Sequence, residues 1–185
     1  ESRDNGTSEA VHIRLTKPFY IGKHEITVDQ FRRFVAVTGH ATEAEKPGRT
    51  GLAWDADGNV WRESGHFTWN HPNFPQQDDH PIVLVSWEDA IAFCDWVSEL
   101  ADNTTRLPTE TQWEYAARAG SDAEWCFGGE VAELVHFANV ADAALSWLHP
   151  AISIEDKSWS DSYAYLAPVG SLHANAFGLH DVHGN

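Results

Sequence analysis

The stretch RLPTETQWEYAARAG, residues 106–120, contains a start signal, an apolar face and a stop signal for one short helix. Thr109 precedes Gln112 by three positions, the capping-box spacing in which each side chain satisfies an unpaired backbone donor at a helix start. Gly120 supplies a residue that tolerates the left-handed conformation common just past a helix end. The stretch therefore predicts a helix whose buried face consists of Trp113, Ala116 and Ala117, with the small residues allowing close approach of another element.

Two other segments begin with the same signal. Thr27 pairs with Gln30 in one segment, and Ser86 stands three residues before Asp89 in the other. The first helix is expected to end at the glycine at 39 and to bury Phe31, Phe34 and Val35. The second carries so many apolar residues that it is expected to be buried on two sides, through Trp87, Ala90, Ile91, Phe93, Cys94, Trp96, Val97 and Leu100.

The rest of the sequence predicts little regular structure. Residues 11–15 and 19–26 are expected to be short strands, and 82–85 is either a buried strand or a buried extended segment. Residues 48–79 and 127–166 show no sustained period and are expected to be long ordered loops, which in compact domains often have a functional reason. These patterns predict one α+β domain spanning residues 1–185, with few regular elements.

Charge and hydropathy narrow the classes of partner. The chain has 185 residues with 12 basic and 28 acidic side chains, giving a formal charge of −16. Such a field repels phosphate backbones and anionic lipid surfaces, so neither nucleic acid nor membrane is expected as a partner. No run of 18 apolar residues occurs, so no membrane insertion is expected. The sequence begins with Glu1, which is compatible with export after removal of a signal peptide, and the compartment is left open.

Three stretches, in this order, carry a resemblance to a known family: HPIVLVSWEDAIAFCDWVSE at 80–99, RLPTETQWEYAARAG at 106–120 and NAFGLHDVHGN at 175–185. Together they resemble the formylglycine-generating-enzyme/sulfatase-modifying-factor family over nearly the whole chain. The resemblance implies a C-type-lectin-like variant of the α+β class, with long ordered loops and bound structural calcium. Family membership of this kind indicates fold more firmly than chemistry.

The resemblance implies two functions of different kinds. Oxidase members of the family convert a cysteine of a sulfatase to Cα-formylglycine, using molecular oxygen and a copper ion held by two active-site cysteines. A protein or peptide substrate such as a sulfatase is then expected. That cysteine pair is expected beyond Asn185, so no catalytic residue is assigned here and copper is expected only with such a region. The alternative is a non-catalytic, lectin-like module that binds a ligand or protein through loop 48–79.

Calcium is the cofactor that the resemblance assigns to residues of this chain. It implies a site formed by the side chains of Asn139 and Asp161 and the carbonyl oxygens of Val140 and Tyr163. Asn185 matches a ligand of a second calcium site. Mixed side-chain and backbone oxygens suit a hard cation that takes six to eight ligands. The alternative is purely structural, with Asn139 capping a turn and Asp161 forming an Asx-turn.

The remaining chemically distinctive residues favour structural roles. Cys94 is expected to pack in the core or to be half of a lost disulfide, and two cysteines so far apart do not form a CxxC motif. His180 and His183 lie without an HExxH pattern and are expected to be exposed or hydrogen-bonded. Glu114 is expected to pair with Arg118. Three tryptophans could line a substrate cleft or form a cluster that supports the loop: Trp54, Trp61 and Trp69.

Overall fold

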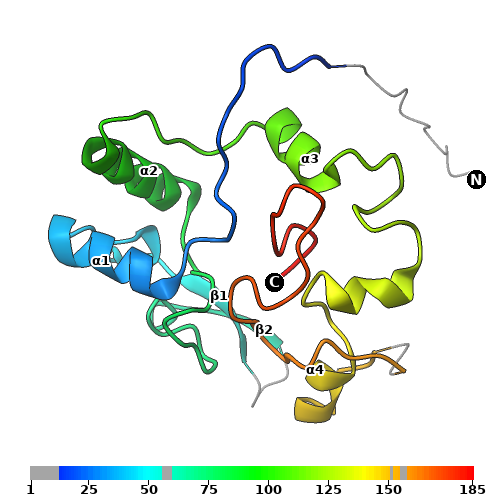
Figure 1. Cartoon of the computed structure of the whole chain (residues 1–185). Helices are drawn as coiled ribbons and strands as arrows, with labels where there is room; N and C mark the ends of the chain where they lie inside the picture. The colour runs from blue at the N-terminus through cyan, green and yellow to red at the C-terminus, as the bar shows by residue number, and fades with distance from the viewer. Residues whose placement is uncertain (1–12, 56–59, 151, 155–157) are drawn as a thin grey trace, which may run out of the picture.

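The chain folds into short helices and a β-hairpin joined by long loops (Figure 1). This computed structural model describes residues 13–55, 60–150, 152–154 and 158–185. None of its helices has the length and apolar character needed to cross a bilayer. The elements in chain order are α1 Val28–Thr38, η1 Glu43–Glu45, β1 Gly51–Asp55, β2 Val60–Ser64, α2 Trp87–Ala101, α3 Glu110–Arg118, η2 Val131–His136 and α4 Ala143–Leu148, where η denotes a 3-10 helix.

All three predicted capping boxes are present. At α1 the backbone N–H of Gln30 donates to Thr27 Oγ1 over 3.2 Å, and the Gln30 side chain accepts from the Thr27 N–H over 2.9 Å. The same reciprocal pattern starts α2 and α3. The glycine at 39 is left-handed as predicted, with φ of 70°. Two successive residues are left-handed at the end of α3: the cap Ala119, with φ of 50°, and the predicted Gly120, with φ of 89°.

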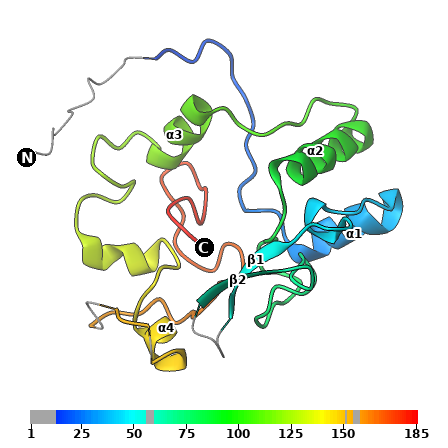
Figure 2. The ribbon, with the colours of Figure 1, turned by 180° about the vertical axis from the view of Figure 1, so that it is seen from behind.

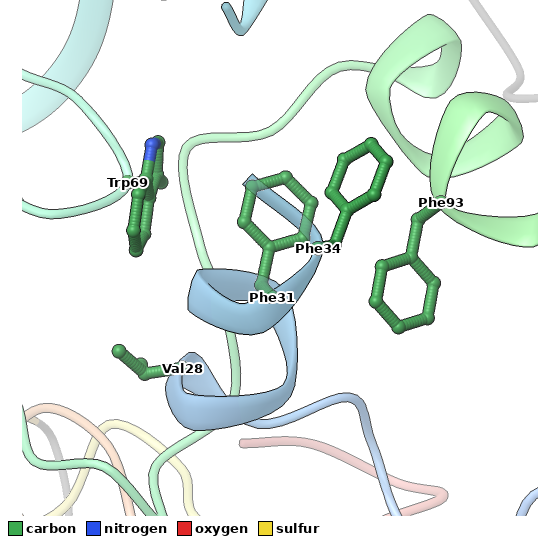
Figure 3. Packing of buried hydrophobic residues seen from close by; sticks show 5 residues of the cluster. All are labelled: Val28, Phe31, Phe34, Trp69 and Phe93. Atoms are coloured by element: carbon green, nitrogen blue, oxygen red, sulfur yellow. The ribbon is translucent and has the colours of Figure 1, made fainter. Parts of the chain in front are cut away.

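The main apolar core lies between α1, α2 and the loop that follows the hairpin (Figure 3). Phe31 is central: its ring lies 5.3 Å from that of Phe34, 5.4 Å from Trp69 and 5.9 Å from Phe93. Edge-to-face and offset contacts at these distances are the favoured arrangements of aromatic rings. The predicted α1 face is therefore confirmed, and Trp69 is part of the core rather than of a cleft.

On α2 and α3, some of the apolar residues that were predicted to be buried are exposed to solvent. Trp87 and Leu100 of α2 are each 67% exposed, and Trp113 of α3 is 42% exposed. Phe93, Cys94, Ala116 and Ala117 are buried as predicted. The expectation that α2 is buried on two sides is wrong, because helical spacing shows which residues share a face but not how far neighbouring segments extend over it.

The predicted strands before α1 are not formed. Residues 13–15 and 19–26 have no strand structure, and Val11 and His12 lie outside the described residues. A bridge between Thr27 and Pro81 is isolated, flanked by bonds from the backbone N–H of Ile82 to the Ile26 carbonyl and from that of Val28 to the His80 carbonyl. Extended backbone without a longer partner segment cannot build a ladder. Residues 82–85 form neither of the predicted alternatives, because Leu84 is left-handed with φ of 57° and all four residues are half-buried rather than buried.

The two predicted loops contain short helices and strands that were not predicted. Within 48–79, β1 and β2 form an antiparallel hairpin in which Trp54 lies opposite Trp61. The Asp57-Gly58 dipeptide between them is a recognised hairpin signal. Within 127–166, η2 and α4 are helical, and Asp142 caps α4 by accepting from the Ala144 N–H over 2.7 Å. Both regions are otherwise irregular, as predicted.

The carboxyl-terminal segment, residues 175–185, lies in the middle of the molecule rather than on its rim, as both ribbon views show (Figures 1 and 2). The Asn175 side chain donates to the carbonyls of Ala116 and Ala117 at the end of α3, over 2.8 and 3.1 Å. The backbone N–H of His180 donates to the Lys23 carbonyl over 3.1 Å. This central segment therefore joins α3 to the chain that precedes α1.

Candidate metal centre

Asp161 connects the residues predicted to bind calcium. Its Oδ2 accepts from the backbone N–H of Val140 over 2.7 Å, and its Oδ1 accepts from that of Tyr163 over 2.8 Å. The second bond is the Asx-turn that the structural alternative predicted. A carboxylate oxygen has more than one lone-pair site, so these bonds leave acceptor capacity on Asp161. The structure thus brings Asn139, Val140, Asp161 and Tyr163 together.

The other predicted ligand atoms keep their oxygens available. The Asn139 side chain donates through Nδ2 to the Tyr165 carbonyl over 2.7 Å and, more weakly, to Asn185 Oδ1 over 3.3 Å. Among the described residues, nothing donates to Asn139 Oδ1 or to the carbonyls of Val140 and Tyr163. Amide and carbonyl oxygens of this kind are ligands for calcium.

Two buried carboxylates meet at this centre. Asp142 is 0% exposed and Asp161 is 7% exposed, and the backbone N–H of Asp161 donates to the Asp142 carboxylate. Burial raises the pKa of Asp161 and the nearby Asp142 charge adds to the rise, while the bonds from Val140 and Tyr163 oppose it. In the described part of the chain neither carboxylate pairs with Lys or Arg. Buried anions without a counter-charge are costly, so these residues fit a hard cation.

Asn185 occupies a second polar cluster nearby. Its Oδ1 accepts from the Ala167 N–H over 2.7 Å and from Asn139, while its Nδ2 donates to Glu25 Oε2 and the Ala167 carbonyl, each over 3.0 Å. Burial raises the pKa of Glu25 to about 7, with a further rise from Asp181 and a partial offset from Asn185. Asp181 Oδ1 is buried without a hydrogen-bond partner in the described residues. The amide of Asn185 thus bridges three segments, and its role as a ligand of a second cation stays a prediction.

Two residues of these clusters were not among the predicted ligands. Asp142 has a sequence signal, because it stands directly before the apolar run of α4 at an N-cap position and three residues after Asn139. Glu25 has none, since it lies in a segment expected to be a strand and meets Asn185 only through the fold. In the part of the chain that the structure describes, no group of three or more His, Cys, Asp and Glu side chains is arranged to hold a metal ion. A centre here would therefore depend on backbone and amide oxygens.

The cysteines do not suit a copper-binding pair. Cys94 is buried on α2 and Cys126 is half-buried in the loop after α3, and both thiols are free. Burial raises the pKa of each thiol, which disfavours the thiolate that binds metals and attacks substrates. Cys94 is therefore a packing residue, as predicted.

The two histidines and the two hairpin tryptophans considered above also have structural partners. His183 Nε2 accepts from the backbone N–H of Cys126 over 3.2 Å, and His180 Nδ1 is 2.7 Å from the Leu172 carbonyl oxygen. Both are hydrogen-bonded, as predicted. Trp54 and Trp61 form an edge-on pair across the hairpin with ring centroids 5.8 Å apart. The tryptophans therefore divide between the hairpin and the core instead of lining one cleft.

Known proteins resemble this chain in sequence and in structure. It is 31% identical to the formylglycine-generating enzyme of Thermomonospora curvata over 98% of this chain and 62% of that protein. It is 30% identical to the bovine formylglycine-generating enzyme over 99% of this chain and 50% of that protein. The mouse protein named inactive C-alpha-formylglycine-generating enzyme 2 is 29% identical over 91% of this chain and 56% of its own length. The chain thus spans between 50% and 62% of the length of these three relatives.

A solved structure shares the fold. The structure of PvdO from Pseudomonas aeruginosa matches with a TM-score of 0.65 and 25% identity, over 88% of this chain and 52% of that one. The match confirms the predicted α+β fold of the sulfatase-modifying-factor type, while its description as lectin-like stays a prediction. The model of the sulfatase-modifying factor enzyme 1-like domain matches residues 2–185. The chain therefore belongs to the sulfatase-modifying factor family.

Proposed function

We propose that this chain is the calcium-binding scaffold of an oxidase that converts a cysteine of a protein substrate, such as a sulfatase, to Cα-formylglycine. The observation that carries the proposal is the family match over residues 2–185, supported by relatives named formylglycine-generating enzyme. The grouping of Asn139, Val140, Asp161 and Tyr163 around one buried carboxylate supports the calcium part.

Within this proposal the chain's own residues hold a cation and fix the central segment. Asp161 and Asn139 would bind calcium with the carbonyls of Val140 and Tyr163, and the ion would supply the positive charge that the two buried carboxylates lack. Asn139 also touches Asn185, so the cation would help hold the central segment in place. Copper does not fit Cys94 and Cys126, and no oxidation step is assigned to them.

Thermal unfolding with and without calcium tests the metal centre. A ligand that binds only the native state adds about 2.7 kcal/mol of stability when its concentration is a hundred times its dissociation constant. For a calcium site with a dissociation constant of about 10 µM, 1 mM calcium is roughly that excess. Calcium at this concentration should therefore raise Tm by several degrees relative to a sample in excess chelator. Asp161→Asn should abolish the rise. The matched control is Asp122→Asn, an exposed carboxylate outside the centre, which should keep it. A wild-type melting curve that does not change in excess chelator would refute the calcium assignment.

Activity is tested with a cysteine peptide taken from a sulfatase, supplied with copper and oxygen. Mass spectrometry and aldehyde labelling detect conversion of the thiol to formylglycine. The expected result is that Cys94→Ser and Cys126→Ser change neither the turnover of any protein that contains this chain nor its copper(I) binding. Tight, stoichiometric copper(I) binding that is lost in Cys126→Ser would contradict the structural role of that thiol.

A non-catalytic binding module is the second candidate. It is favoured by the match to the mouse protein named inactive, which extends over 91% of this chain. A calcium-dependent rise in Tm combined with no aldehyde product in the peptide assay would favour this candidate over the oxidase.

A further inference from the structure

A cleft of about 510 Å³ lies between α1 and the loop 66–76, and none of the predicted calcium ligands lines it. Val28 and Arg32 contribute from the helix, and the loop contributes His, Asn, Gln and Phe side chains. Its volume is within the range of small-molecule sites, in which a few fixed polar groups orient a ligand against apolar walls. The hydrogen bonds of its polar side chains indicate which chemistry it fits.

Asn70 and His71 form a fixed donor and acceptor pair. Asn70 Oδ1 accepts from the Thr68 hydroxyl over 2.7 Å and lies 2.9 Å from His71 Nδ1. Because an amide oxygen can only accept, His71 Nδ1 carries the proton, and in the neutral ring Nε2 is left as an acceptor. The Asn70 Nδ2 group is left as a donor. Neither Asn70 Nδ2 nor His71 Nε2 has a partner among the described residues.

Asn73 and Gln76 add two acceptors. The Asn73 side chain donates through Nδ2 to the Trp54 carbonyl over 2.8 Å, and Gln76 donates through Nε2 to the Pro81 carbonyl over 3.2 Å. Each amide is therefore held by its nitrogen, and within the described part of the chain its oxygen has no donor. Side chains fixed by backbone bonds lose little freedom when a ligand binds, which favours affinity.

The walls and the charge of the cleft exclude an anion as the preferred ligand. Phe67 and Phe74 are half-buried, and Phe74 stacks on Tyr165 with ring centroids 5.0 Å apart. The Arg32 charge is already matched by Asp78 at 2.8 Å and by Asp29 at 3.8 Å. With a formal charge of −16 on the whole chain, a negatively charged ligand would be repelled.

We propose that this cleft binds a neutral, hydroxyl-rich ligand, a saccharide. Hydroxyl groups can donate to the three acceptors His71 Nε2, Asn73 Oδ1 and Gln76 Oε1, and can accept from Asn70 Nδ2. The carbon face of a sugar ring packs against the phenylalanine walls. This inference rests on the cleft alone and does not depend on whether the protein oxidises a thiol.

The test is an NMR titration of the calcium-supplied chain with methyl glucoside, methyl mannoside and methyl galactoside. With these few hydrogen bonds, at least one sugar should bind with a Kd of about 1 mM and shift the side-chain amides of Asn70, Asn73 and Gln76. Asn70→Asp keeps the oxygen that Thr68 and His71 use but removes the Nδ2 donor. It should weaken binding about tenfold. Asn103→Asp is the matched control, since Asn103 Oδ1 also accepts a bond, from the Thr104 N–H over 2.8 Å, and lies outside the cleft.

Three results would overturn the proposal. They are the absence of cleft shifts with all three sugars, equal binding by the Asn70→Asp variant, and tighter binding of glucuronate than of glucose. Amide dispersion in the spectrum reports whether each variant is folded. If Asn70→Asp does not fold, His71→Phe supplies the same comparison, because it keeps a ring in place and removes the Nε2 acceptor. Unchanged sugar binding by that variant would likewise refute the proposal.

Discussion

Replacing Asp89 with Asn tests how the half of the molecule built on α1 and α2 is held together. Asp89 is 1% exposed, and its carboxylate accepts from the backbone N–H of Ser86 over 2.8 Å and from that of Glu43 over 3.2 Å. It also lies 2.8 Å from His40 Nε2. One side chain therefore closes the start of α2 and fixes the chain that follows α1.

The size of the effect follows from these contacts. Asparagine keeps one acceptor oxygen but turns an N–H₂ group toward groups that donate, so at least one buried donor loses its partner. A buried donor without a partner costs about 1–3 kcal/mol, and a bond to a charged group contributes about 1.5–3 kcal/mol. Asp89→Asn should therefore lower the free energy of unfolding by about 3 kcal/mol, which is large against a typical total of about 5–15 kcal/mol.

The effect should depend on pH in one direction. Burial alone raises the pKa of Asp89, but the bonds from Ser86, His40 and Glu43 outweigh it and hold the pKa below its ordinary value of 3.8. A lowered folded-state pKa means that the carboxylate stabilises the fold fully above about pH 4 and loses this contribution as the pH falls through the folded pKa. The difference between wild type and Asp89→Asn should shrink over that acidic range.

Urea unfolding measures the change through the midpoint at a constant m-value. Asp95→Asn is the control, because Asp95 is an exposed carboxylate on the same helix, and it should change the free energy of unfolding by less than about 0.5 kcal/mol. An Asp89→Asn midpoint equal to that of the control would show that the contacts of Asp89 do not hold this half of the fold. A difference from wild type that stayed constant down to the lowest pH would refute the charge-based explanation.

Three substitutions that test the backbone can be checked in the same denaturant series. Gly51→Ala should destabilise the fold by about 2–4 kcal/mol, since an added Cβ would lie 2.2 Å from the Phe67 carbonyl oxygen; a loss below about 0.5 kcal/mol would contradict that close approach. Ala119→Gly should change stability by less than about 0.5 kcal/mol, because it relieves the strain of a φ of 50° but removes a buried methyl group. Gly39→Ala, at a φ of 70° with nothing within 4 Å of an added Cβ, should destabilise by about 1 kcal/mol, and an opposite order of these two variants would refute the backbone argument.

The helix caps could be predicted from the sequence, whereas the burial of helix faces by distant segments could not. The caps at Thr27, Ser86 and Thr109 depend only on residues three positions apart, and all are formed. The exposure of Trp87 depends on which distant segments reach α2, and no local spacing encodes that. The segment 19–26 has strand-like composition, but a strand also needs a partner, and here the chain offers a single bridge.

The candidate metal centre likewise contains some residues that could be predicted from the sequence and others that could not. The family resemblance named Asn139, Val140, Asp161 and Tyr163, and the structure brings them together. It did not name Asp142, which shares the buried charge. Glu25 could not be found from its own neighbourhood, because its contact with Asn185 joins residues 160 positions apart.

That 160-position contact also bears on how the protein is made. Helices and the hairpin can form while the ribosome is still adding residues, because their contacts are close in sequence. The side chain of residue 185 must emerge before Glu25, Ala167 and Asn139 acquire their shared partner. Completion of the native structure is therefore delayed until synthesis has passed this position, and nascent chains shorter than this should lack the finished centre.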